Sequence, residues 1–174
     1  MDIAVFIISA LYFLLHLIFY YGLKRSAEIR QNLSDRLPFI SIIVAARNEE
    51  NNIGNCINSL KNITYPKELY EVILVNDKST DSTKEIILQN TQNHQEFFLL
   101  DTIDAPESKL TGKVKALSFG ISKSKGELIM MTDADCIVNK SWLIESAKYY
   151  KSTTGLLCGF TMIDYSQGLF SKLQ

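Results

Sequence analysis

The sequence feature that most constrains the fold is a short apolar run at 128–132, which is followed by Asp133 and Asp135. The run has the length and composition of a buried strand. In an open α/β sheet, ligands bind outside the carboxyl ends of the strands, so both carboxylates are expected to face a ligand. Two carboxylates this close repel each other unless a cation lies between them. A divalent cation with a phosphate-bearing substrate is therefore favoured.

Strand-like and helix-like segments alternate along most of the chain, which predicts an α/β fold with a mostly parallel sheet and flanking helices. The helix at 113–122 is expected to pack through Val114, Leu117 and Ile121. The helix that opens near residue 82 is expected to be capped by Asp81 or Ser82, with Glu85 near the third position. Strands are predicted at 39–46, 72–75, 97–100 and 128–132, a further extended segment at 155–162, and the other helices at 51–60 and 141–150.

Residues 3–23 form an almost unbroken apolar run, and a helix of roughly 20 residues spans a bilayer. Asp2 precedes the run and Lys24, Arg25 and Arg30 follow it, so the positive-inside rule places the remainder in the cytoplasm. A signal peptide is the alternative, but its charges precede the apolar run and a small-residue cleavage site follows it. We therefore expect one transmembrane helix (1–23) in the cell inner membrane. A juxtamembrane connector (24–37) and a cytoplasmic catalytic domain (38–174) are expected to follow.

Composition excludes other classes of protein. The formal net charge is −1, and no basic patch is interleaved with aromatic residues, which argues against a nucleic-acid partner. The three cysteines, Cys56, Cys136 and Cys158, form no CxxC pair, so neither a zinc site nor a disulfide framework is indicated. We expect reduced thiols with packing roles.

Three more motifs follow or precede predicted elements. Residues 45–50 end the first strand, where polar groups face a ligand crevice or form a capping turn. Asp77 follows the second strand and is placed to accept hydrogen bonds from a base or a ribose hydroxyl, whereas Asp81 suits a helix cap. Lys113 follows Gly112 at a helix start, where a cation is unfavourable unless a ligand phosphate is bound. The alternative for Lys113 is an ordinary surface lysine.

In their order and spacing, these motifs resemble the family 2 glycosyltransferases with the GT-A fold. The resemblance is strongest to membrane-anchored bacterial members of the cellulose-synthase and hyaluronan-synthase kind, which serve polysaccharide biosynthesis. It covers residue 39 to the end, and the combination of motifs is specific although each piece is weak. The motifs are Ala-Arg-Asn-Glu-Glu (46–50), Val-Asn-Asp-Lys-Ser-Thr-Asp (75–81), Gly-Lys-x-x-Ala-Leu (112–117) and Thr-Asp-Ala-Asp (132–135).

The resemblance implies a nucleotide-diphosphate-sugar donor, commonly a UDP-sugar, and a metal ion, Mg²⁺ or Mn²⁺. Asp77 would contact the uracil or the ribose, Lys113 would approach the diphosphate or the base edge, and Asp133 would lie against the ribose or the sugar. Asp135 would hold the metal. The backbone and side chains near the end of the first strand would complete the donor site, namely Ala45, Arg47, Asn48 and Glu49.

An inverting enzyme also needs a carboxylate base for the acceptor hydroxyl. The resemblance implies an aspartate in a later Glu-Asp-like motif, followed in many processive members by a Gln-x-x-Arg-Trp-like motif, and neither is present. We therefore expect the base beyond residue 174, the donor-binding half within this chain, and a glycan or lipid-linked acceptor. A catalytically inactive, membrane-anchored nucleotide-binding fragment or partner subunit is the alternative. A Rossmann-type oxidoreductase is disfavoured because Gly-x-Gly-x-x-Gly does not follow the first strand.

Overall fold

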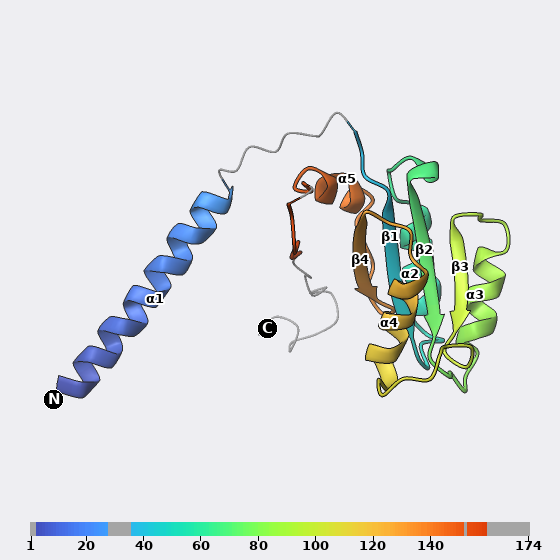
Figure 1. Cartoon of the computed structure of the whole chain (residues 1–174), viewed down its shortest axis with the longest axis horizontal. Helices are drawn as coiled ribbons and strands as arrows, with labels where there is room; N and C mark the ends of the chain where they lie inside the picture. The colour runs from blue at the N-terminus through green and yellow to red at the C-terminus, as the bar shows by residue number, and fades with distance from the viewer. Residues whose placement is uncertain (1–2, 28–35, 152, 160–174) are drawn as a thin grey trace. The chain divides into compact units, whose positions relative to one another are not determined.

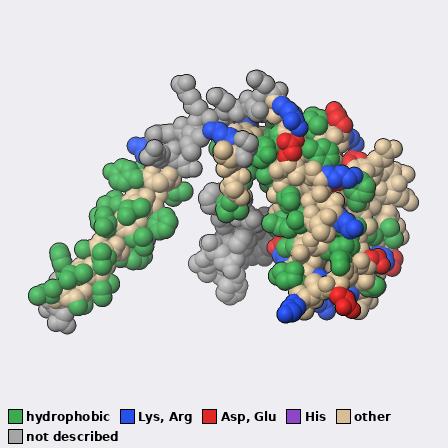
Figure 2. Space-filling model, viewed as in Figure 1, with side chains coloured by type: hydrophobic (Ala, Val, Ile, Leu, Met, Phe, Trp, Pro, Cys, Tyr) green, Lys and Arg blue, Asp and Glu red, His purple; other side chains and the backbone are tan. Residues whose placement is uncertain are grey.

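The N-terminal apolar run forms one helix, α1 (Ile3–Ala27), which is long and apolar enough over Ile3–Lys24 to cross a membrane. Its 25 residues extend about 37 Å, more than the thickness of the hydrocarbon core of a bilayer. Hydrophobic side chains cover the visible face of this helix in Figure 2. The structure, a computed structural model, describes residues 3–27, 36–151 and 153–159. The predicted connector thus begins as the last turn of α1, and its residues 28–35 lie outside the described part.

Four parallel strands form the sheet of the domain that follows α1, in the order β3-β2-β1-β4 among the described residues (Figure 1). Ile42, Ile43 and Val44 of β1 are fully buried, because helices cover both faces of the sheet around this central strand. The predicted parallel sheet is confirmed, with strand bounds within two residues of those expected. The strands are β1 (Ile40–Ala46), β2 (Tyr70–Asn76), β3 (Phe97–Asp101) and β4 (Leu128–Asp133).

Helices pack on both faces of this sheet. On one face, Leu60, Ile87 and Leu143 from three helices share the larger core with the β1 and β2 side chains. On the other face, Phe119 packs against Ile43. The helices are α2 (Ile53–Lys61), α3 (Thr83–Thr91) and α5 (Trp142–Ala147) on the first face and α4 (Gly112–Lys123) on the second, with a 3-10 turn, η1 (Lys67–Leu69), before β2.

The predicted packing face of α4 is confirmed only at Leu117, which is partly buried against the core. The helix buries Ala116, Phe119 and Gly120, whereas Val114 and Ile121 are exposed. Small residues at 116 and 120 let the helix approach the sheet closely. A Cβ added at Gly120 would lie 2.7 Å from Ile43 Cγ2. The spacing of the large apolar residues in the sequence indicates a different face of the helix. That spacing carries no information about how closely the helix can approach the sheet through small residues.

The strand β4 lies at one side of the described sheet, next to β1 only. Ile129 and Met131 of β4 are exposed. Their register with β1 places both side chains on the face of the sheet that α4 covers over β1 and β2. The extended segment predicted at 155–162 forms no strand over its described residues, 155–159, and its last three residues lie outside the described part.

Candidate functional site

The carboxyl ends of β1, β2 and β4 meet around a cavity of about 310 Å³. The register explains the meeting, because Ala45 of β1 pairs with Val75 on one side and with Asp133 on the other. All of the residues predicted for the donor site and the metal line this cavity except Asn48. The lining residues are Ala45, Ala46, Arg47, Glu49, Asp77, Gly112, Lys113, Asp133, Ala134 and Asp135.

Asp77 is the most constrained carboxylate of the cavity. It is buried, its backbone N–H donates to Ala46 O at 2.8 Å, and its Oδ2 lies 4.0 Å from Arg47 Nη1. The Thr102 hydroxyl donates to Asp77 Oδ1 at 2.9 Å. Sequence reasoning missed Thr102, whose only signal was a hydroxyl placed directly after a strand. These contacts leave Oδ2 of Asp77 as the oxygen that faces Arg47 and the cavity.

Lys113 lies in the first turn of α4, directly after Gly112, whose φ of 56° is left-handed. Its Nζ donates to Asp133 Oδ1 at 2.5 Å, and both side chains are more than half exposed. The N-cap residue of this helix, Thr111, makes no side-chain capping bond. The positive charge at this helix N-terminus is therefore balanced by the carboxylate of Asp133 at the end of β4. An incoming anion or cation can displace this contact.

Acidic groups outnumber basic groups in the cavity. Glu49, Asp77, Asp133 and Asp135 bring four negative charges, and Arg47 and Lys113 bring two positive ones. A negatively charged ligand alone would meet net repulsion here, whereas a bound divalent cation would remove the excess.

The donor set of the cavity fits a metal ion shared with a substrate. Within the described ranges, no cluster of three or more His, Cys, Asp or Glu side chains could hold a metal by itself. Asp133 ends β4 and Asp135 lies in the loop that follows; both side chains are hard oxygen donors, and both residues are exposed. Magnesium-type sites commonly use one or two carboxylates and complete their shell with substrate phosphates and water. The two aspartates match that pattern.

Two cysteines lie beside this loop. Cys56 is buried in α2, and its thiol donates to Asp133 O at 3.7 Å. Burial raises the pKa of the Cys56 thiol to about 12, with smaller electrostatic contributions from Cys136 and Asp135. The thiol therefore stays protonated and unreactive. Cys56 therefore supports the loop as a packed, neutral side chain.

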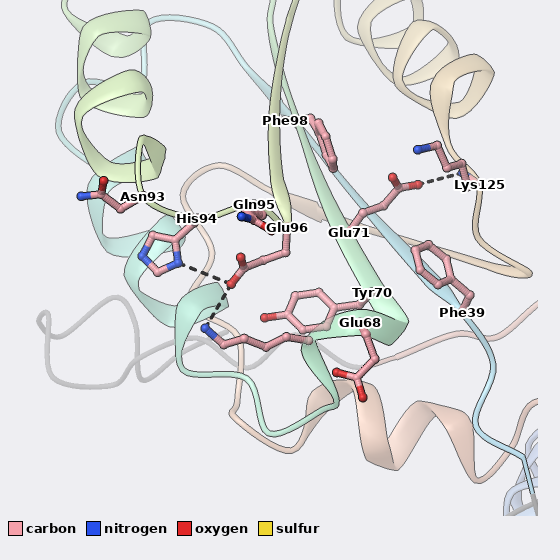
Figure 3. A pocket seen from close by; sticks show the side chains of 11 residues that line it. Phe39, Glu68, Tyr70, Glu71, Asn93, His94, Gln95, Glu96, Phe98 and Lys125 are labelled. Atoms are coloured by element: carbon pink, nitrogen blue, oxygen red, sulfur yellow. Dashed lines mark hydrogen bonds and ion pairs between the residues drawn. The ribbon is translucent and has the colours of Figure 1, made fainter.

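A larger hollow, of about 600 Å³, lies at the opposite edge of the sheet, near the amino ends of β2 and β3 (Figure 3). Two of its carboxylates, those of the buried Glu71 and the partly buried Glu96, are engaged in local structure. Glu71 Oε1 accepts from Ser41 Oγ at 2.6 Å and from Lys125 N at 2.8 Å. Glu96 lies 3.3 Å from Lys67 Nζ and 3.4 Å from His94 Nδ1. Because these contacts tie turns to the sheet, we assign the chemistry to the smaller cavity.

The sequence of the domain that carries this cavity matches one protein family. Residues 41–174 match the profile of glycosyl transferase family 2. The chain belongs to glycosyl transferase family 2. The family predicted from the four motifs is confirmed.

Curated relatives of the chain are named as glycosyltransferases or polysaccharide synthases. Glycosyltransferase AglE of Haloferax volcanii is 35% identical over 111 residues, which cover 64% of this chain and 35% of that protein. Poly-beta-1,6-N-acetyl-D-glucosamine synthase of Staphylococcus aureus (strain MSSA476) is 28% identical over 171 residues, covering 97% of this chain and 39% of that protein. The chain thus spans well under half the length of these relatives.

Solved structures resemble the chain as well. The mannosyltransferase PcManGT of Pyrobaculum calidifontis, solved with GDP-Man and Mn²⁺, matches with a TM-score of 0.64 at 24% identity over 81% of this chain and 41% of that one. This likeness shows the GT-A fold. S. aureus TarS 1-349 in complex with UDP-GlcNAc matches with a TM-score of 0.52 at 30% identity, covering 62% of this chain and 30% of that one.

Proposed function

We propose that this chain binds the nucleotide-diphosphate-sugar donor, a UDP-sugar, of a membrane-anchored glycosyltransferase. The enzyme would transfer the sugar to a glycan or lipid-linked acceptor with inversion of configuration at the anomeric carbon. One observation carries the proposal. Seven of the eight residues expected to bind donor or metal line one cavity at the carboxyl edge of a family 2 domain. The choice of uridine is supported by S. aureus TarS, a 30% identical neighbour that was solved with UDP-GlcNAc.

The charges of the cavity suggest a role for each side chain. Asp77, fixed from one side, would accept from the uracil or the ribose beside Arg47. Lys113 would leave Asp133 for the diphosphate, and Asp133 would then accept from the ribose or sugar hydroxyls. Asp135 would hold Mg²⁺ or Mn²⁺. A divalent cation bound there would act as a Lewis acid and neutralise charge on the leaving diphosphate.

The remaining predicted residues differ in their access to the donor. Ala45 and Glu49 line the cavity, and the Glu49 carboxylate accepts from Asn52 Nδ2 at 2.9 Å. Asn48 does not line it, because its side chain is directed to a neighbouring loop. We assign no residue of the described part as the base that deprotonates the acceptor. Asp164, the one acidic residue after 145, lies outside the described residues.

The helix α1 supports a membrane location for the protein. It is long and apolar enough to cross a bilayer, and Lys24 and Arg25 follow its apolar part. By the positive-inside rule, the catalytic domain would lie on the cytoplasmic side of the cell inner membrane. An acceptor that is a growing glycan or a lipid-linked sugar would be reached at that surface.

Calorimetric titration of UDP into the full chain in detergent tests the donor proposal. We expect binding that requires Mn²⁺ and that is lost in Asp135→Ala. A matched control is Glu107→Ala, which removes an exposed carboxylate that does not line the cavity. A folded chain, as judged by circular dichroism, that binds UDP neither with nor without Mn²⁺ would contradict the proposal. Binding that is indifferent to Mn²⁺ would contradict the metal role alone.

A further inference from the structure

Two loops that follow neighbouring strands are joined by hydrogen bonds between side chains and backbone. Asn48, just after β1, accepts from Thr80 N through its Oδ1 at 2.9 Å. In return, Asn48 N donates to Ser79 Oγ at 3.1 Å. The side-chain amide of Asn48 is thus used in holding the loop after β2, and Asn48 does not line the cavity.

The same two loops make further bonds of this kind. Glu50 N donates to Asp81 Oδ2 at 3.2 Å, and Ser82 N donates to Glu50 Oε2 at 3.1 Å. Glu49 N donates to Thr83 Oγ1 at 2.8 Å. Asp81, predicted as a cap, therefore also serves as a link between the loops. We refer to these bonds, between residues 48–50 and 79–83, as the loop clasp.

One residue of the clasp and one residue directly before it have an unusual backbone conformation. Asn48 has a φ of 56° and Lys78 a φ of 55°, in the left-handed region that residues other than glycine seldom adopt. Conformations of this kind persist where the surroundings determine them. Arg47 precedes the first of these residues and Asp77 precedes the second, so each strained residue is adjacent to a charged side chain of the cavity.

We propose that Asn48 is a positioning residue for the donor site: its Oδ1 locks the loop after β2 against the loop after β1, so that Arg47 and Asp77, 4.0 Å apart, stay side by side at the nucleotide position. This inference rests on the proposed function, because it assumes that Arg47 and Asp77 meet the nucleotide. It assigns Asn48 a role through its neighbours and not through contact with the donor.

The chemistry of the clasp defines informative variants. Asn48→Asp keeps a side-chain oxygen for the Thr80 N–H and tolerates the left-handed conformation. Asn48→Gly relieves the backbone strain but removes the acceptor. Thr80→Val is a matched control, because it keeps the N–H and removes only the hydroxyl, which lies 3.4 Å from Asn48 Oδ1.

The first readout is the affinity of the full chain for UDP in the presence of Mn²⁺. We expect Asn48→Gly to weaken UDP binding about three- to tenfold, the equivalent of one lost hydrogen bond. Asn48→Asp and Thr80→Val should stay within about twofold of wild type. If the Asn48 amide instead touches the donor, a carboxylate beside the diphosphate would make Asn48→Asp at least as weak as Asn48→Gly. That order of affinities would overturn the proposal.

The second readout does not depend on nucleotide. Hydrogen exchange of the Thr80 amide should be faster in Asn48→Gly than in wild type and unchanged in Asn48→Asp. Equal exchange in all three proteins would overturn the clasp. A wild-type chain that fails to bind UDP would overturn the proposed function, and the positioning role with it. In that case, the exchange rates would still report whether the clasp exists.

A double-mutant comparison tests whether Asn48 acts through Asp77. In an Asp77→Ala background, adding Asn48→Gly should weaken UDP binding by a smaller factor than it does in the wild-type background, since one of the two groups that it positions is already absent. Losses that simply multiply would mean that Asn48 acts independently of Asp77 and would contradict the proposal.

Discussion

Thr102 fixes the orientation of Asp77: its buried hydroxyl donates to Asp77 Oδ1 at 2.9 Å, from the residue that follows β3. The backbone of Thr102 is itself held, because its N–H donates to Asn76 O at 3.0 Å. The third strand thus contributes to a site whose cavity is lined by residues from the ends of the other strands and from α4.

Thr102→Val should weaken both stability and donor binding. The substitution keeps the shape of the side chain but leaves a buried carboxylate oxygen without its donor, which costs about 1–3 kcal/mol. Urea unfolding of the detergent-solubilised chain measures the first effect, and UDP titration measures the second. Thr102→Ser, which keeps the hydroxyl, should retain UDP affinity. A loss of UDP affinity in Thr102→Ser without a loss in Thr102→Val would show that packing of the methyl group, and not the hydrogen bond, is what matters.

Lys113→Gln should change the affinities for the metal and for the nucleotide in opposite directions. The pair with Asp133 is exposed on both sides, so its removal should change stability by less than about 1 kcal/mol. Without this competing cation, the chain should bind Mn²⁺ more tightly in the absence of nucleotide, and it should bind UDP more weakly. Calorimetry of both ligands checks the two directions. A weaker Mn²⁺ affinity in the variant would contradict the idea that Lys113 competes with the metal.

Gly120→Ala should destabilise the domain. The added Cβ would lie 2.7 Å from Ile43 Cγ2 and 3.1 Å from Val75 Cγ2, in a fully packed core, and overpacking of this kind costs about 1–3 kcal/mol. Gly54→Ala in α2 is the matched control, because its Cβ would meet only Ile86 Cγ2, at 3.8 Å. This control should be neutral or gain up to about 1 kcal/mol from helix propensity. Equal urea midpoints for the two variants would contradict the close packing of α4.

Asp101 should contribute to loss of stability in acid. Burial acts to raise the pKa of Asp101, but hydrogen bonds from Ile103 N, Asn76 Nδ2 and Lys84 Nζ outweigh it and hold the pKa below its usual value. A lowered pKa in the folded state means that this contribution is complete above the unfolded pKa, about 3.9. The contribution is lost as the pH falls through the lower pKa of the folded state.

The corresponding variant is Asp101→Asn. It should be less stable than wild type at pH 7 by about 1–3 kcal/mol, and the difference should narrow as the pH falls below about 4. Urea unfolding across this pH range measures the difference. Asp104→Asn, at an exposed position on the same loop, is the control for the loss of one negative charge. A constant difference for Asp101→Asn at all pH values would contradict the linkage.

Much of the lining of the smaller cavity could be predicted from the sequence because its residues lie at the ends of strands or directly after them. Once the strands are parallel, Ala45, Asp77 and Asp133 must meet at one edge, whatever the details of packing. The burial of Asp77 and the pairing of Lys113 with Asp133 could not be predicted in the same way. Both depend on how far α4 and the loop after β3 approach the sheet.

The sequence by itself determined the order of strands and helices, the apolar N-terminal helix and the motifs of a family 2 glycosyltransferase, since these depend on local periodicity and composition. The tertiary structure alone decided which face of α4 is packed, which residue donates a hydrogen bond to Asp77 and which residue donates one to Asn48. Thr80 is 32 residues from Asn48, and Thr102 is 25 residues from Asp77. Contacts across such separations arise from the register of the sheet and the depth of helix packing, which no local pattern encodes.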